Sequence, residues 1–159
     1  MLETKRFDFD DLAKVVDLDG DGFQELGFWT TTFDYFGVCY ACSPKPMAWF
    51  RYNAATQRYE PANETLFPYL KARYEKNLRG LSTLEQYLTD HISDSYMRGD
   101  VMEIVLNYLY AGRDAEAWAI HKKRNTFEDQ AGNRVNIKQR LASDPFYREL
   151  RARRKRDGR

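Results

Sequence analysis

The spacing of apolar residues changes once along this chain of 159 residues. In the first part, apolar side chains come in short runs rich in aromatic and β-branched residues, a composition typical of β-strands. Further along they recur every four residues, at Leu66, Leu70, Tyr74 and Leu78, which is the spacing of one face of an α-helix. The sequence therefore predicts an α+β fold, with a small antiparallel β-unit followed by a helical half.

The two regions meet near residues 60–65. We expect a β-unit over residues 1–62 and a helical region with a basic C-terminal tail over residues 63–159. The β-unit should hold three or four antiparallel strands, with an edge strand or ordered arm near the N-terminus. Its clearest strand signals are residues 26–33, 47–52 and 58–60.

Glycines and capping residues predict where the helices begin and end. We expect C-terminal stops at Gly80, Gly99 and Gly112. Residues 82–85 and 100–103 each have the pattern of an N-terminal capping box. The expected start of the last helix is Ser143-Asp144-Pro145.

Residues 17–25, Asp-Leu-Asp-Gly-Asp-Gly-Phe-Gln-Glu, have the oxygen ligands of a hard cation. The first three carboxylates alternate in a tight loop, so their side chains turn towards a common centre, and Gly22 permits the positive φ of such a turn. We predict a Ca²⁺ site; Mg²⁺ is the second choice because it requires fewer protein ligands in stricter octahedral geometry. The expected ligands are the side chains of Asp17, Asp19, Asp21 and Glu25 and the backbone carbonyl of Phe23.

This loop begins like an EF-hand but differs from it at two positions. Gln24 stands where a hydrophobic residue is usual, and Phe28 stands where a bidentate glutamate is expected. An EF-hand is therefore disfavoured. The alternative to a cation site is an acidic, glycine-rich surface turn that holds no metal.

Residues 15–26, followed by an aromatic and β-branched run, resemble the FG-GAP/VCBS-type repeat. The resemblance covers about residues 12–60, in a single copy. It implies a loop that binds calcium between β-strands of a propeller blade or a related β-unit. By the same resemblance, Asp17, Asp19, Asp21 and Glu25 are side-chain ligands and Phe23 is a carbonyl ligand.

Cys39 and Cys42 form a Cys-x-x-Cys pair, and the chain has no other cysteine. A zinc site would need two more ligands at matching spacing. A thioredoxin-like motif expects a helix after the pair, and the Ser-Pro-Lys-Pro of residues 43–46 discourages one. We expect a local disulfide in an oxidising compartment or two unreactive thiols, and we favour the disulfide.

Charge is unevenly distributed. Residues 1–62 carry six Lys and Arg against ten Asp and Glu, whereas residues 63–159 carry nineteen against fourteen. The basic C-terminus could contact phosphate or an anionic membrane, or it could be a solvated helix end with cations suited to the dipole. The candidate anion contacts are Arg151, Arg153, Arg154, Lys155 and Arg156.

Nothing in the sequence indicates an enzyme, since it lacks a nucleophile elbow, a Walker loop and a zinc-protease helix. His91 is expected to be a buried histidine bonded to a backbone carbonyl. No apolar run approaches the length of a membrane span, and the first residues do not have the pattern of a signal peptide.

Three functional hypotheses follow. The first is a calcium-binding, non-catalytic interaction or structural module of an envelope or secreted protein, periplasmic or extracellular, that binds another macromolecule, preferably a protein. The second is a cytoplasmic accessory protein that contacts nucleic acid or an acidic partner through its basic C-terminal helix. The third is a carbohydrate-binding domain that uses the aromatic-rich β-half; aromatic residues make up 15% of the chain.

Overall fold

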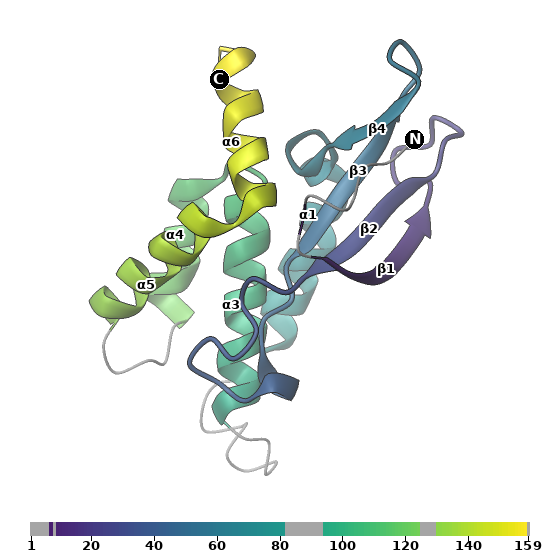
Figure 1. Ribbon diagram of the computed structural model, residues 1–159. Helices are drawn as coiled ribbons and strands as arrows, with labels where there is room; N and C mark the ends of the chain where they lie inside the picture. The colour runs from purple at the N-terminus through teal and green to yellow at the C-terminus, as the bar shows by residue number, and fades with distance from the viewer. Residues whose placement is uncertain (1–6, 8, 82–93, 125–129, 159) are drawn as a thin grey trace.

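The computed structural model describes residues 7, 9–81, 94–124 and 130–158, and it has the predicted α+β fold (Figure 1). The strands are β1 (Phe9–Val16), β2 (Glu25–Thr30), β3 (Met47–Asn53) and β4 (Arg58–Pro61), with the 3₁₀ helix η2 (Tyr40–Cys42) between β2 and β3. The helices are α1 (Asn63–Gly80), α3 (Asp94–Tyr110), α4 (Asp114–Arg124), α5 (Gln130–Ser143) and α6 (Pro145–Arg156).

The four strands form one antiparallel sheet in the order β1-β2-β3-β4, so each strand pairs with its neighbour in sequence. The antiparallel strands predicted from the sequence are confirmed. However, β2 ends at Thr30, three residues before the expected end, because the chain turns where Asp34 N–H bonds to Thr31 O. Phe33 is fully buried in this turn, so the aromatic run beyond Thr30 reflects burial rather than strand structure.

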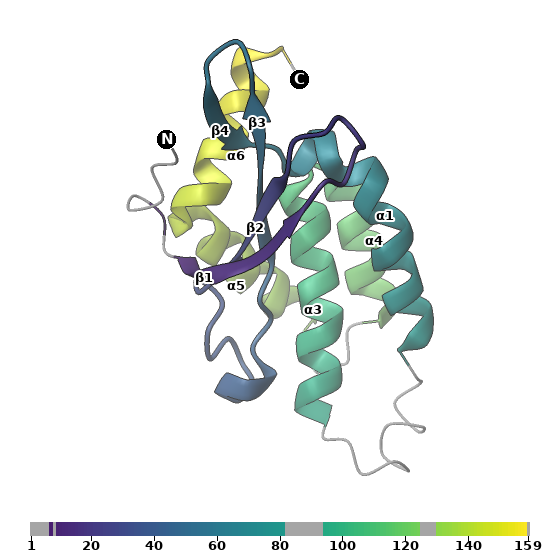
Figure 2. The ribbon, with the colours of Figure 1, turned by 90° about the vertical axis from the view of Figure 1, so that its right-hand side faces the viewer.

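Strands and helices share one hydrophobic core, and the helices pack on the sheet (Figure 2). Phe28 and Phe50 contact each other on one face, and the Phe50 ring lies 5.4 Å from that of Phe146 in α6. Asn63, the first residue of α1, accepts a hydrogen bond from the Trp49 N–H at 2.8 Å and donates one to Met47 O at 2.7 Å. The first helix is thereby fixed to β3 directly after the sheet ends.

Helix α3 corrects one predicted boundary. It runs through Gly99 and Asp100, where the sequence predicted the end of one helix and the start of another. A Cβ atom on Gly99 would lie 1.9 Å from the carbonyl oxygen of Cys42, so this glycine allows close packing of η2 on the helix. Gly80 and Gly112 do end their helices, as predicted. The predicted box at residues 82–85 and His91 lie outside the described residues.

Helix α6 begins where the sequence predicts, at the buried N-cap Asp144. One oxygen of this side chain accepts hydrogen bonds from the N–H groups of Phe146 at 2.8 Å and Tyr147 at 3.0 Å. The other accepts one from the Tyr110 hydroxyl in α3. The basic residues 151–156, expected as a tail, are helical and belong to α6.

Candidate metal centre

The loop with the alternating aspartates connects β1 to β2 at one end of the sheet, where Val16 pairs with Glu25. Gly20 has φ +77° and Gly22 has φ +87°, both in the left-handed region. Side chains other than glycine are strained in this conformation, so the two glycines let the loop turn back tightly. The turn predicted at Gly22 is present, and a second one occurs at Gly20.

Three carboxylates converge in this loop. One oxygen each from Asp17, Asp19 and Asp21 lies within 4.8 Å of the others. Backbone N–H groups of the same loop hold them there: Gly20 and Gly22 donate to Asp17 at 2.8 and 3.1 Å. Asp19 and Asp21 each accept a hydrogen bond from the residue two positions further on, at 3.2 and 2.8 Å. These donors oppose the mutual repulsion of the three negative charges.

Arg51 of β3 adds a positive charge that the sequence analysis did not include. Its Nη2 lies 2.9 Å from Asp19 Oδ2 and 2.7 Å from Asp21 Oδ2. The Phe23 N–H and then the Arg51 guanidinium lower the pKa of Asp21. Because the β2–β3 register pairs Leu26 with Phe50, Arg51 lies at the level of the loop. A correct prediction of how β2 pairs with β3 would have indicated the contact between Arg51 and the aspartates.

Glu25, the first residue of β2, lies behind the three aspartates. Its side chain is fully buried, with 0% exposed, and Oε2 accepts a hydrogen bond from the Leu18 N–H at 2.6 Å. Oε1 has no hydrogen-bond partner in the part of the chain that the structure describes. Burial, and after it the negative charges of the three aspartates, raise the pKa of Glu25. A buried carboxylate oxygen without a donor is destabilising by about 1–3 kcal/mol, and a bound cation would satisfy it.

Phe23 occupies the end of the loop, and its half-exposed ring lies 5.0 Å from the ring of Tyr52 on β3. This contact holds the Phe23 side chain against β3. The structure therefore brings together Asp17, Asp19 and Asp21 of the predicted ligands. Glu25 is not part of this group, and its Oε2 accepts the Leu18 N–H of the same loop. Three converging carboxylates and a buried fourth match the oxygen-rich ligand sets of Ca²⁺.

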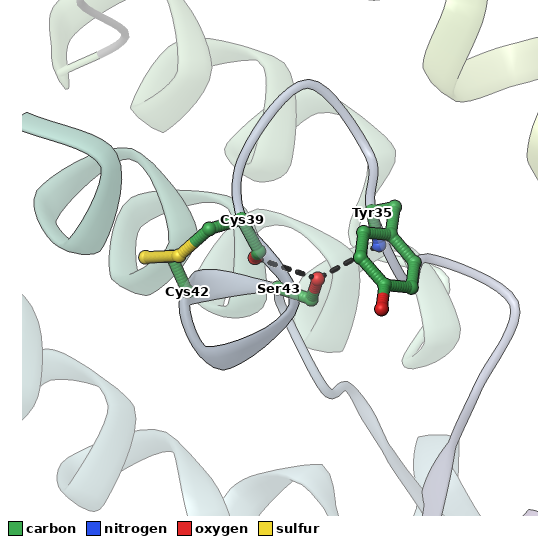
Figure 3. Close-up of a disulfide and its surroundings, with 4 residues drawn as sticks. All are labelled: Tyr35, Cys39, Cys42 and Ser43. Carbon is green, nitrogen blue, oxygen red and sulfur yellow. Dashed lines mark hydrogen bonds between the residues drawn. A yellow bond between two sulfur atoms is a disulfide. The ribbon is translucent and has the colours of Figure 1, made fainter.

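The two cysteines lie at the opposite end of the sheet from this loop, and their sulfur atoms are joined (Figures 1 and 3). Ser43 stabilises the segment, since its hydroxyl donates to Cys39 O at 3.1 Å and accepts from the Tyr35 N–H at 2.8 Å. The disulfide closes η2, which packs on Gly99 of α3. Its surroundings are therefore structural contacts, distinct from the candidate metal site.

The basic residues of α6 fall into two groups. Arg153 pairs with Glu60 of β4 at 3.1 Å and with Glu149 at 3.0 Å, and Arg156 pairs with the same Glu149 at 3.4 Å. Arg154 donates to two carbonyl oxygens at the end of α3, at 3.3 and 2.6 Å. These three candidate anion contacts thus have acceptors within the molecule. Arg151 and Lys155 lie elsewhere on the helix, beside a cavity.

The aspartate triad is the only group of three or more metal-ligating side chains that comes together within the described residues. In that same part of the chain, no helix combines the length and the apolar character needed to cross a bilayer. Comparison of the chain with protein-family models, with curated proteins and with solved structures gives no match.

Proposed function

We propose that the β1–β2 loop binds Ca²⁺ and that the protein is a calcium-stabilised, non-catalytic interaction module of an envelope or secreted protein. The observation that carries this proposal is the convergence of Asp17, Asp19 and Asp21 within 4.8 Å of one another. The buried Glu25 at the end of the same loop adds a carboxylate whose Oε1 has no hydrogen-bond partner among the described residues. The resemblance of the loop to the FG-GAP/VCBS-type repeat supports the same assignment.

The present contacts indicate how a cation would enter. The guanidinium of Arg51 lies between Asp19 and Asp21, so positive charge is already favoured at this point. A dication placed among the aspartates would replace Arg51 and interact with charges that one guanidinium neutralises only in part. Ca²⁺ suits such a site better than Mg²⁺, because its six to eight ligands need no strict octahedral geometry.

The role of the cation would be structural. The loop joins two strands, and neither flank is a helix that could reorient as in a calcium sensor. Sites in extracellular modules bind Ca²⁺ with dissociation constants of about 10⁻⁴–10⁻³ M, so they fill where calcium is abundant. The Cys39–Cys42 disulfide supports the same location, because disulfides persist in oxidising compartments.

The test is thermal unfolding of protein shown to be free of metal, with millimolar Ca²⁺ or with chelator. At a hundredfold excess over Kd, binding adds about 2.7 kcal/mol to the free energy of unfolding, which corresponds to a rise of about 5–10 °C in Tm. Asp19→Asn should abolish the rise. Asp11→Asn, which removes the same charge from an exposed position on β1, should retain it. Identical melting curves in calcium and in chelator would overturn the proposal.

A carbohydrate-binding role is the second candidate, and one cavity favours it. This cavity has a volume of about 390 Å³ and lies beside the disulfide, between the sheet and α3. Trp29, Tyr40 and Tyr96 line it with side chains 41–48% exposed, and Asp100 and Glu103 add carboxylates. Exposed aromatic rings offer apolar faces, and carboxylates accept hydrogen bonds from hydroxyl groups.

This second candidate is tested by titrating neutral oligosaccharides while recording tryptophan fluorescence. Binding that is lost in Trp29→Ala and retained in Trp118→Phe, a change on the far side of the molecule, would support it. No binding by the unmodified protein at millimolar oligosaccharide would exclude it.

A further inference from the structure

Helix α6 carries its unpaired cations on one face. Arg148, Arg151 and Lys155 are spaced three and four residues apart, so they lie along the same side of the helix. The acid on this helix, Glu149, is already paired, since it accepts both Arg153 and Arg156. The two faces of α6 therefore differ in free positive charge.

The face with unpaired cations borders a cavity with a volume of about 950 Å³ between α4, α5 and α6. In Figure 1, α4 and α5 lie on the side of α3 away from the sheet, and α6 runs upward from them. Trp118, Leu141 and Tyr147 form an apolar wall. Lys138 of α5 adds a fourth cation, and its ammonium lies 5.8 Å from the centre of the Trp118 ring.

These four cations have no anionic partner among the described residues. None of Lys138, Arg148, Arg151 and Lys155 lies within 4.0 Å of a described carboxylate oxygen. Asp114, at the start of α4, is the one acid lining the cavity besides the already paired Glu149. The cavity therefore combines an excess of free positive charge with an apolar wall.

We propose that this cavity binds a small organic polyanion, namely a phosphate ester with at least two negative charges and a ring or other apolar body. Guanidinium and ammonium groups are the usual protein ligands of phosphate. Aromatic and aliphatic side chains such as Trp118 and Leu141 are usual in the lining of small-molecule sites and can contact the apolar body of the ligand. The proposal does not depend on the calcium loop, since none of these residues belongs to it.

A small molecule fits these observations better than a nucleic-acid strand does. A strand needs a continuous row of available cations along its backbone. On α6, Arg153 and Arg154 are held by Glu60 and by the carbonyl oxygens of α3, so the row is interrupted. The available cations instead surround a concave site.

The test is calorimetric titration of the full chain with three probes at fixed ionic strength. ADP has both charge and a ring, pyrophosphate has the charge alone, and adenosine has the ring alone. We expect ADP to bind most tightly, pyrophosphate about tenfold more weakly, and adenosine not measurably. No binding of ADP at millimolar concentration would overturn the proposal, and equal binding of ADP and adenosine would do the same.

Matched variants locate the site. Arg151→Gln with Lys155→Gln should weaken ADP binding by about tenfold or more, because two charge-assisted contacts are lost. Arg58→Gln with Lys76→Gln removes the same charge outside the cavity lining and should change the affinity by less than about twofold. Equal losses of ADP affinity in the two double variants would show non-specific electrostatic attraction and would overturn the proposed site. A short RNA that binds through Arg151 and Lys155 while ADP does not would also overturn it.

Discussion

The β1–β2 loop and helix α6 both concentrate charge of one sign, but they stabilise it by different means. The loop places four acids within nine residues, and its own backbone N–H groups hold them. Helix α6 has five cations within six residues. Arg153 and Arg156 share Glu149 of the same helix, but Arg153 also reaches Glu60, and Arg154 reaches Tyr110. The acids of the loop are therefore held mainly by local contacts, whereas the cations of α6 also depend on tertiary ones.

The largest effect is expected from breaking the tertiary contacts of α6 at its N-cap. Asp144→Ala removes the acceptor for two helix N–H groups and leaves the buried Tyr110 hydroxyl without that partner. Loss of the cap and of a buried hydrogen bond should together lower the free energy of unfolding by about 2–4 kcal/mol. Urea unfolding measures this change.

Asp144→Asn is the control, because asparagine is an equally good N-cap. Its single oxygen can keep the two helix N–H bonds, and its NH₂ group replaces the second oxygen and can donate to the Tyr110 hydroxyl oxygen. Asp144→Asn should lower the free energy of unfolding clearly less than Asp144→Ala does. If the two variants unfold at the same urea concentration, the hydrogen bonds of Asp144 do not stabilise α6 in the way described.

The difference between the two regions explains what the sequence could predict. The loop was predictable down to its residues because alternate carboxylates and a glycine determine the turn without help from the rest of the chain. The contact of Arg51 with the loop was not predictable, because it depends on the register in which β2 pairs with β3. The α6 cavity needs three helices, so no local pattern marks it.

Helix boundaries show the same difference: those determined by local residues were predictable, and those that depend on tertiary contacts were not. Asp144-Pro145 acts locally, as an N-cap and a first helical residue, and its prediction was correct. Gly99 was misread as a stop because its role lies in a tertiary contact, the approach of the Cys42 carbonyl. A glycine in sequence does not distinguish the end of a helix from a point of close packing.

A second comparison concerns two acids, Asp21 in the loop and Glu103 in α3. Hydrogen bonds from Phe23 N–H and Arg51 lower the pKa of Asp21. Burial raises the pKa of Glu103 from 4.5 to about 7, aided by the charge of Asp100 and opposed by the Lys45 N–H and by Arg73. Glu103 therefore holds a proton in the folded state at pH values where the unfolded chain has lost it.

The raised pKa of Glu103 predicts a loss of stability with rising pH. Between about pH 4.5 and pH 7 the folded state binds more protons at this site than the unfolded state, so the free energy of unfolding falls as pH rises. The full effect on the free energy of unfolding is at most about 3–4 kcal/mol. Glu103→Gln should be more stable than the unmodified protein at pH 8 and should show a flatter dependence across this window. A variant with the unmodified slope would contradict this assignment.

A smaller effect is expected in the loop when no metal is present. Asp19→Asn in chelator removes a contact with Arg51 but also relieves repulsion from Asp17 and Asp21. Because the two terms oppose each other, the free energy of unfolding should change by less than about 1 kcal/mol. Urea unfolding in chelator measures it. A loss above about 2 kcal/mol would mean that the fold depends on this aspartate even without calcium.

The last prediction concerns Arg51 and calcium affinity. The guanidinium contacts one oxygen each of Asp19 and Asp21, two of the three converging aspartates, so we expect a bound cation to displace it. Arg51→Gln removes this competitor, and the variant should bind Ca²⁺ about three- to tenfold more tightly in a calorimetric titration.

Loss of any nearby positive charge would also favour a cation, so the control is Arg58→Gln on the adjacent strand. Arg58 carries the same charge as Arg51 but forms no ion pair with the aspartates. A gain in Arg51→Gln beyond that in Arg58→Gln measures direct competition for the loop. Equal gains in Ca²⁺ affinity would mean that Arg51 acts only through its positive charge and does not compete directly for the aspartates. Weaker binding in Arg51→Gln would mean that the guanidinium orients the aspartates for the metal instead of excluding it.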